Sequence, residues 1–249
     1  MPLDAAFLKP IAHRGLHDLA RGRIENSAAA FEAALAHGYG IECDLRPAAC
    51  GTPIAFHDDT LSRLVDSQDA LRALDAATLK RLRYRGDASP IVEFAALLEL
   101  VAGREPLLVE IKSEWAAPDP RFLQAIAALS TAYRGPLALM SFDPAVMTAI
   151  RELAPGVPRG IVSGLYEGQG WWRDKIDDRR AFALSHFLES RPAAPDFYAY
   201  DVKALPTPVT RFVREVLELP LFTWTVRTPE QRKIAERWAD APIFEGYEP

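Results

Sequence analysis

The chain has very little cysteine, since only Cys43 and Cys50 occur among its 249 residues. Their spacing matches neither a zinc site nor the disulfide framework of a small secreted domain, so we expect two reduced thiols. No uninterrupted apolar run approaches the ~18 residues that a membrane-spanning helix needs. Asp4 and Lys9 also interrupt the first residues, where a signal peptide would be apolar. These absences predict a cytoplasmic protein with no integral membrane segment.

A basic excess is missing as well, because 29 Lys and Arg residues stand against 34 Asp and Glu residues, a formal net charge of −5. Nucleic-acid-binding proteins usually carry a strongly basic face, so we expect no nucleic-acid partner. A small anionic ligand is compatible with this charge, since a few local Arg or Lys side chains are enough to bind it. The length and the 49% hydrophobic content fit one large α/β domain, and we assign residues 1–249 to it.

Short apolar stretches alternate with amphipathic ones, and no linker or low-complexity tract separates them. The predicted strands cover residues 10–13, 39–45, 106–112, 136–141, 159–162, 197–201, 220–226 and 241–245. The predicted helices cover residues 26–37, 92–102, 120–133, 144–153, 173–189, 208–217 and 229–238. Alternating strands and helices indicate a parallel sheet, and eight strands predict a closed (β/α)8 TIM barrel. An open doubly wound sheet is the alternative, but no glycine-rich phosphate loop opens any helix.

Two features depart from a regular barrel. Residues 52–60 form a ninth strand-like run, and a turn at Cys50 and Gly51 can fold residues 52–57 back beside the second strand as a hairpin. With the turn centred there, His57 lies opposite Asp44, and a slip of a residue or two is also compatible with the sequence. We therefore predict a β-hairpin extension and a short helical insertion over roughly residues 46–92, and a short or absent final helix.

Polar residues interrupt three predicted strands near their carboxyl ends, namely His13, Arg14, Glu42, Asp44, Glu110 and Lys112. Residues two apart on a strand share a face, so Glu42 and Asp44 point the same way, with Cys43 on the other side against a helix. Glu110 and Lys112 share a face in the same manner. Active sites of TIM barrels lie at the carboxyl ends of the strands, so these residues are predicted to meet there.

Three neighbouring carboxylates repel one another unless a cation lies between them, which makes Glu42, Asp44 and Glu110 candidate metal ligands. A set of oxygen ligands favours Mg²⁺ or Ca²⁺ over Zn²⁺. Arg14 and Lys112 beside such an ion suit an anion that bridges metal and protein, and phosphate is the first candidate. Two histidines, His13 and His57, would then serve as general acid and general base.

Each of these residues has a simpler interpretation when taken singly, such as a rim hydrogen bond or a same-face ion pair, and only their conjunction favours a site. His37 and His186 have such structural interpretations, and His17 fits a structural role slightly better than a place at the edge of the site. Trp171 and Trp172 fit a role in loop packing better than a role as an aromatic wall that binds a choline-like cation.

Several motifs together resemble the glycerophosphodiester phosphodiesterase family, in its compact cytosolic form. They are IAHRG, ENS, GYGIECDLRP, PIAFHDDTLSRL, LLVEIKSE, LMSFDPAVM and LFTWTVRT, and they extend over nearly the whole chain. The resemblance implies a TIM barrel that uses a divalent cation to hydrolyse glycerophosphodiesters to glycerol 3-phosphate and an alcohol. It also implies a general place in glycerol and lipid metabolism.

The resemblance also implies roles for single residues. His13 and His57 match the paired catalytic histidines, and Glu42, Asp44 and Glu110 match the metal carboxylates. The residues matched to substrate and phosphate binding are Arg14, Lys112, Glu25, Phe142 and Trp224. The chain departs from the family pattern after the last strand, where FEGYEP replaces a Thr-Asp and a proline, and Glu245 is the candidate substitute.

Other functions are compatible with the same residues. A lysophospholipase D-like enzyme would need an apolar groove, for which the paired tryptophans are the only signal. A non-catalytic barrel that binds phosphate compounds is disfavoured because every charged position of the pattern is filled. A metal-assisted lyase or isomerase acting on a carbonyl compound has less use for two histidines and a basic pair. A homodimer could cover the position of the missing final helix.

Overall fold

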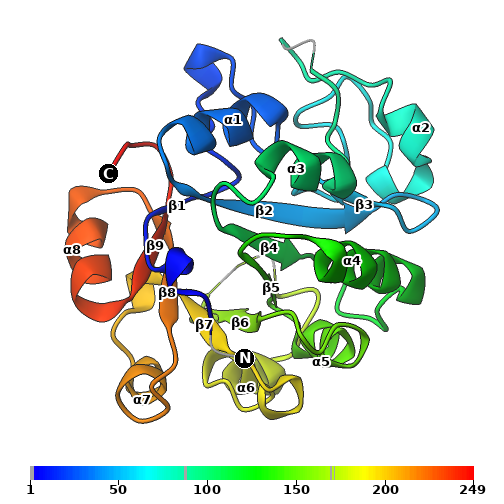
Figure 1. Ribbon diagram of the computed structural model, residues 1–249. Helices are drawn as coiled ribbons and strands as arrows, with labels where there is room; N and C mark the ends of the chain where they lie inside the picture. The colour runs from blue at the N-terminus through cyan, green and yellow to red at the C-terminus, as the bar shows by residue number, and fades with distance from the viewer. Residues whose placement is uncertain (1–2, 87–88, 169, 171) are drawn as a thin grey trace.

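The computed structural model describes residues 3–86, 89–168, 170 and 172–249, and within them nine strands form one sheet (Figure 1). The strands are β1 (Ile11–Ala12), β2 (Gly40–Pro47), β3 (Pro53–Ala55), β4 (Leu107–Ile111), β5 (Leu137–Ser141), β6 (Arg159–Ser163), β7 (Phe197–Asp201), β8 (Leu221–Val226) and β9 (Ala241–Phe244). All but β3 run parallel, and β1 pairs with both β9 and β2, which closes the barrel. The predicted TIM barrel is confirmed, and the open sheet is excluded.

Helices surround the barrel (Figure 1). They are α1 (Ala28–Ala36), α2 (Ala76–Leu79), α3 (Phe94–Val101), α4 (Pro120–Ala132), α5 (Pro144–Leu153), α6 (Asp178–Ser185), α7 (Pro208–Glu215) and α8 (Pro229–Trp238), with short 3₁₀ turns η1 (Ala5–Phe7), η2 (Leu19–Arg21), η3 (Leu71–Ala73), η4 (Arg191–Ala193) and η5 (Val202–Ala204). Thr207 and Thr228 form capping boxes before α7 and α8. The first helix begins later than predicted, because Ser27 and not Asn26 caps it.

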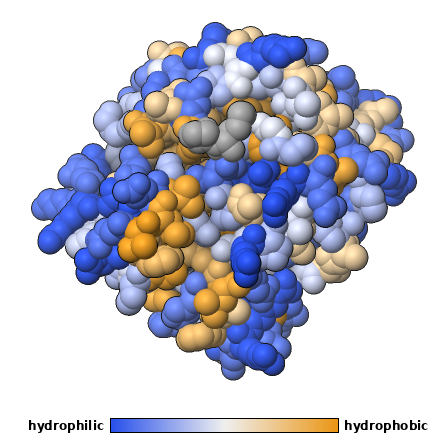
Figure 2. Space-filling model, turned by 60° about the horizontal axis from the view of Figure 1, so that its bottom comes forward, coloured by the Kyte–Doolittle hydropathy of each residue, from blue (hydrophilic) through white to orange (hydrophobic). Residues whose placement is uncertain are grey.

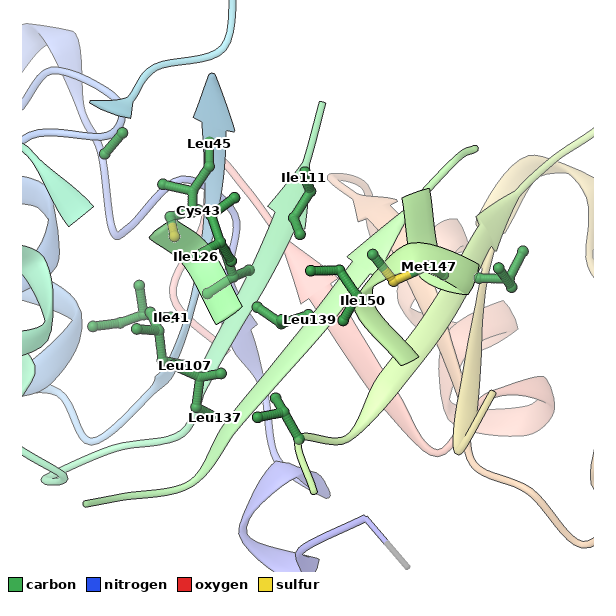
Figure 3. Close-up of a cluster of buried hydrophobic side chains, with 14 of the residues drawn as sticks. Ile41, Cys43, Leu45, Leu107, Ile111, Ile126, Leu137, Leu139, Met147 and Ile150 are labelled. Atoms are coloured by element: carbon green, nitrogen blue, oxygen red, sulfur yellow. The ribbon is translucent and has the colours of Figure 1, made fainter. Parts of the chain in front are cut away.

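The barrel strands separate apolar packing from polar groups by alternation. On β2, Ile41, Cys43 and Leu45 point outward and pack in a cluster with residues of β4, β5, α4 and α5 (Figure 3). The intervening Glu42 and Asp44 belong to the opposite face of the strand. The prediction that Cys43 packs on the helical side is therefore confirmed.

Apolar side chains fill the interior of the barrel toward the amino ends of the strands. This inner cluster contains Phe7, Ile11, Leu108, Ala138, Met140, Val162, Phe197, Ala199, Phe222, Ala241 and Ile243. Phe7 comes from η1, which lies across this end of the barrel (Figure 1), and its ring stacks 6.5 Å from that of Phe222. Because these side chains fill the amino end of the barrel, the only room that the described part of the chain leaves for the polar residues of the strands is at the carboxyl ends.

The predicted hairpin is present, but its register differs from the prediction by one residue. Leu45 pairs with Ala55, and the Phe56 amide donates to the Asp44 carbonyl at 3.0 Å. The difference arises because Gly51 adopts a left-handed φ of 85°, so the loop closes over one more residue. Asp44 therefore faces Phe56, and the prediction that His57 lies opposite Asp44 was wrong by that residue.

The segment after the hairpin has an apolar cluster of its own, which attaches it to the barrel. The cluster contains Ile24, Ala48, Ile54, Phe56, Leu61, Val65, Leu71, Leu79, Tyr84 and Ile91. It joins the turn before α1, the hairpin and the inserted segment, so residues of this segment are held at a fixed position beside the carboxyl ends of β1 and β2.

No helix follows β9 in the described part of the chain, as predicted. The ring of Tyr247 packs there instead, 5.3 Å from that of Phe244, and the Arg232 guanidinium lies 3.3 Å above the Tyr247 ring. Tyr39 packs edge-on against Phe244 at 5.0 Å. These aromatic rings cover the outer side of β9 between α8 and α1.

None of the helices that the structure describes is long and apolar enough to cross a membrane. Figure 2 turns the underside of Figure 1, where α6 and α7 lie, toward the reader, and shows apolar groups on a largely hydrophilic surface. Exposed apolar residues of α6, α7 and the turns that follow them are Phe182, Leu188, Phe212, Val216 and Leu217.

Candidate active site

A cavity of about 670 Å³ opens at the carboxyl ends of the barrel strands. The predicted site residues that line it are His13, Arg14, Glu42, His57, Glu110, Lys112, Phe142 and Trp224. The two other predicted residues lie directly behind this wall, where Asp44 contacts Lys112 and Glu25 contacts Arg14. The structure thus brings the predicted residues together in one place.

Three buried carboxylates form the floor of the site. Oxygens of Glu42, Asp44 and Glu110 lie within 4.8 Å of one another, and the three residues are at most 7% exposed. Burial, Asp44 and Glu110 together raise the pKa of Glu42 well above its usual range. Burial also opposes ionisation of Asp44, but Lys112 and Arg14 outweigh it and hold the pKa of Asp44 well below its usual range.

The donor set fits a hard divalent cation. Glu42 Oε1 is buried and has no hydrogen-bond partner among the residues that the structure describes. A bound cation would satisfy this oxygen and offset the repulsion that raises the pKa of Glu42. Carboxylate oxygens without sulfur or nitrogen ligands are typical of Mg²⁺ and Ca²⁺ sites.

Two basic side chains lie on the carboxylates. The Arg14 amide donates to Glu42 Oε2 at 2.9 Å, and Arg14 Nε lies 3.2 Å from Asp44 Oδ2. Lys112 Nζ lies 2.8 Å from Asp44 Oδ1 and 2.6 Å from Glu110 Oε1. Burial opposes the charge of Lys112, but these carboxylates outweigh it and raise its pKa. Both cations are therefore permanently charged at the cavity wall.

The loop between β1 and α1 holds these groups in an unusual backbone conformation. Arg14 and Asn26 adopt left-handed φ values of 56° and 55°, which few residues other than glycine adopt. Asn26 is buried, donates from Nδ2 to Asp44 Oδ2 at 2.8 Å, and accepts from the Asp44 amide at 3.2 Å. This reciprocal pair fixes the Asp44 carboxylate. Such local strain is typical of functional sites.

His13 is oriented by a carboxylate behind it. Its Nδ1 lies 2.8 Å from Glu245 Oε2, while its Nε2 lies 3.9 Å from Glu42 Oε2. A proton on Nδ1, donated to Glu245, leaves the Nε2 lone pair facing the site. Burial lowers the pKa of His13, and the bond to Glu245 only partly offsets this. Glu245 also accepts from Arg227 at 2.9 Å.

His57 follows β3 and lies at the mouth of the same cavity as His13. Its Nδ1 lies 2.7 Å from Asp58 Oδ1, so its Nε2 is directed away from that carboxylate. The Arg46 guanidinium donates to the His57 carbonyl and so ties the end of the hairpin to β2. The paired histidines therefore have one arrangement in common, with Nδ1 on a carboxylate and Nε2 on the other side of the ring.

Aromatic side chains form one edge of the cavity. The rings of Phe142 and Trp224 meet edge to face at 5.2 Å, and Trp115 also lines the cavity. Trp172 is 4% exposed and packs with Ile176, Ala181 and Leu184, which agrees with its interpretation as loop packing. Trp171, considered with it, lies outside the described residues.

Sequence reasoning gave no firm role to several residues of this site. Glu245 was only a candidate substitute, and its signal is a carboxylate directly after the last strand. Asp58 follows His57 directly, which is a sufficient reason to suspect an orienting role. Asn26 was predicted only as the first residue of a helix, and nothing in the sequence indicates that it binds Asp44. Arg63 lies within the PIAFHDDTLSRL motif, but the sequence gave it no role in the site.

The barrel and its mouth define a TIM-barrel protein with an acidic, two-histidine centre at the carboxyl ends of its strands. The chain belongs to the glycerophosphoryl diester phosphodiesterase family, whose model matches residues 13–245. The family that the sequence motifs suggested is therefore confirmed.

Among curated proteins, the chain is similar to "Probable glycerophosphodiester phosphodiesterase 1" of Mycobacterium tuberculosis, with 27% identity over 172 residues. The matched region covers 59% of this chain and 61% of that protein, so the chain spans less than two thirds of the length of this relative. It is also similar to the structure of a Thermotoga maritima glycerophosphodiester phosphodiesterase, with a TM-score of 0.71, 22% identity, and coverage of 95% and 93% of the two chains. A phosphodiesterase of Oleispira antarctica, solved with the product sn-glycerol-3-phosphate, has a TM-score of 0.71, 20% identity, and coverage of 95% and 92%. These two structures support the fold.

Proposed function

We propose that the protein hydrolyses glycerophosphodiesters to glycerol 3-phosphate and an alcohol. The observation that carries the proposal is the buried carboxylate cluster, with Glu42 Oε1 unpaired among the described residues and with Arg14, Lys112 and two oriented histidines around it. Membership of the family supports the reaction class. The product bound to the Oleispira antarctica relative supports glycerol 3-phosphate as one half of the substrate.

Glu42, Asp44 and Glu110 would hold a Mg²⁺ or Ca²⁺ ion. Such an ion neutralises charge on a phosphate oxygen and lowers the pKa of a coordinated hydroxyl. Arg14 and Lys112 carry fixed positive charge at the cavity wall, where they stabilise the charge that develops on the phosphate in the transition state. The acidic floor and the basic wall together suit a ligand that presents an anion to both.

The two histidines divide the proton transfers. One takes the proton of the glycerol 2-hydroxyl as this oxygen attacks phosphorus, which forms a cyclic phosphate. The other gives a proton to the departing alcohol. Their roles then reverse, since water attacks the cyclic phosphate and the 2-hydroxyl regains its proton. The Nε2 atoms of His13 and His57, which lie opposite the carboxylate-bound Nδ1 atoms, are the atoms that exchange these protons.

The assay that tests this function compares three substrates in three conditions. The protein is incubated with glycerophosphocholine, glycerophosphoethanolamine or a lysophosphatidylcholine, each with Mg²⁺, Ca²⁺ or EDTA, and glycerol 3-phosphate and headgroup are measured. We expect turnover of the diesters that EDTA abolishes. Activity unaffected by EDTA would refute the metal assignment, and turnover of the lysolipid alone would favour the lysophospholipase D-like alternative.

Alanine variants test the histidine pair. His13→Ala and His57→Ala should each lower kcat by roughly 10²–10⁴-fold if they transfer protons. His186→Ala is the matched control, because His186 follows α6 and stacks on Phe182 at 4.1 Å, away from the residues that line the cavity. A loss below tenfold for both His13 and His57 would reject the mechanism. The cytoplasmic location, the metabolic role and the homodimer stay predictions.

A further inference from the structure

Arg63 lies in the inserted segment and binds two carboxylates at once. It donates from Nη1 to Glu25 Oε2 at 2.8 Å and from Nη2 to Glu25 Oε1 at 2.7 Å. It also donates from Nε to Asp58 Oδ2 at 2.5 Å and from Nη2 to Asp58 Oδ1 at 3.1 Å. A planar guanidinium fork is the group that can serve two carboxylates in this way.

Each of these carboxylates holds a residue of the proposed centre on its other side. Glu25 Oε1 accepts from Arg14 Nη1 at 2.8 Å, and Asp58 Oδ1 lies 2.7 Å from His57 Nδ1. The result is a continuous row of five charged or polar groups, which runs from Arg14 through Glu25, Arg63 and Asp58 to His57. The row connects the loop after β1 with the end of the hairpin.

The charges along this row alternate, and the central one stabilises both neighbours. Burial opposes the ionisation of Glu25 and Asp58, but their hydrogen bonds to Arg63 and to Arg14 or His57 outweigh it and lower both pKa values. Without Arg63, two ionised carboxylates would face each other at the side of the site. Each would then lose the donor that fixes its plane, and with it the geometry that it passes on.

The inserted segment fixes the position of Arg63. Leu61 and Val65 on either side of it are buried at 0% and 2% exposure in the apolar cluster of the insertion. The Val65 amide donates to the Leu61 carbonyl at 2.9 Å, which closes a turn around Arg63. The side chain itself is 44% exposed and does not line the cavity, so it acts on the site only through its two partners.

We propose that Arg63 is a positioning residue that aligns Arg14 and His57 with each other across the mouth of the site. This inference rests on the proposed function, since it assigns Arg14 to the phosphate and His57 to proton transfer. It gives the inserted segment a part in the reaction, although none of its described residues from Leu61 onward lines the cavity. Removal of Arg63 should misplace both groups by a small distance, which is enough to reduce turnover strongly.

The test compares Arg63→Ala and Arg63→Lys with Arg72→Ala, a control that removes an exposed arginine of the same segment. We expect Arg63→Ala to lower kcat/KM for glycerophosphocholine by about 10–100-fold, as is usual for residues that orient catalytic groups. Arg63→Lys should recover only part of the loss, because one ammonium cannot bind both carboxylates bidentately. Arg72→Ala should match the unmodified protein.

Chemical rescue separates positioning from a merely structural role. Guanidinium ions at low millimolar concentration should restore much of the activity of Arg63→Ala, because the position is accessible, and should leave Arg72→Ala unchanged. Full activity of Arg63→Ala would overturn the proposal. A loss of activity that guanidinium does not relieve, and that comes with a lowered melting temperature, would overturn it too.

A readout without substrate tests the same coupling. The ring signals of His57 in a ¹⁵N NMR spectrum should shift in Arg63→Ala and stay in place in Arg72→Ala, and unchanged signals would overturn the proposal. If the unmodified protein hydrolyses no glycerophosphodiester, the proposed function fails, and the NMR comparison still decides whether Arg63 aligns His57.

Discussion

Glu245 should control the reactivity of His13 without touching the substrate. Its carboxylate lies 2.8 Å from His13 Nδ1 and does not line the cavity. Glu245→Gln keeps the size of the side chain but removes the charge. The amide of Gln can also donate to Nδ1, which would place the imidazole proton on Nε2 and leave no lone pair toward the site.

The size of the effect follows from the bond that is lost. A hydrogen bond to a charged group contributes about 1.5–3 kcal/mol. Since each 1.36 kcal/mol changes a rate about tenfold, kcat/KM should fall by roughly 10–150-fold if the bond is fully expressed in the transition state. Glu245→Asp keeps the charge on a shorter side chain and should lose less than Glu245→Gln.

The assay follows glycerol 3-phosphate release from glycerophosphocholine under saturating Mg²⁺ or Ca²⁺, with melting temperatures measured in parallel. Glu248→Gln is the matched control, because Glu248 lies three residues further on, is 45% exposed, and lies 3.5 Å from Arg21 and 3.7 Å from His37, with no contact to His13 or Glu245 among the interactions of the described residues. A change of less than threefold in Glu245→Gln, with an unchanged melting temperature, would refute the orienting role of this carboxylate.

Three further predictions concern the metal, the pH dependence of stability and the backbone. Glu42→Gln should weaken Mg²⁺ or Ca²⁺ binding by about tenfold or more in calorimetry, and equal binding would contradict the assigned floor. The pKa of Asp58 is lower in the folded state than in the unfolded chain, so the ionised carboxylate stabilises the folded state at pH values above the unfolded pKa. This stabilisation is lost as the pH falls toward the folded pKa. The melting temperature of the unmodified protein should therefore exceed that of Asp58→Asn near neutral pH, and the difference should shrink toward about pH 3; a constant difference would contradict this. Gly15 has a φ of 77°, and a Cβ there would lie 2.8 Å from the Ala30 carbonyl carbon. Gly15→Ala should cost about 3 kcal/mol in urea unfolding, and clearly more than Gly22→Ala, whose Cβ would meet nothing within 4 Å.

Much of the fold could be predicted because local chemistry and tertiary structure agree. Asp143 and Thr228 cap α5 and α8 and are each followed by proline, which is a helix-start signal, and both helices have the predicted limits 144–153 and 229–238. Alternation on β2 assigned Glu42 and Asp44 to one face and Cys43 to the other, because successive side chains of a strand point to opposite faces of the sheet.

The rest depended on backbone angles and side-chain reach, which spacing does not encode. The register of the hairpin changed by one residue because Gly51 takes a left-handed conformation. Helix α6 is shorter than predicted at both ends, since Asp177 caps it and the residues before it form turns. Glu245 is far from His13 in the chain, and Arg63 is far from Glu25, so only the closed barrel and the folded insertion bring each pair together.

The alternation of β2 also turns its cysteine into a reporter of barrel opening. Burial and the neighbouring carboxylates raise the pKa of the Cys43 thiol well above its usual range, so thiol reagents cannot reach or activate it in the closed barrel. Cys50 at the hairpin tip is exposed, and its bond to Thr52 lowers its pKa. Alkylation followed by mass spectrometry should show one fast and one slow adduct. The slow rate would time how often the strand that carries Glu42 and Asp44 detaches from its neighbours.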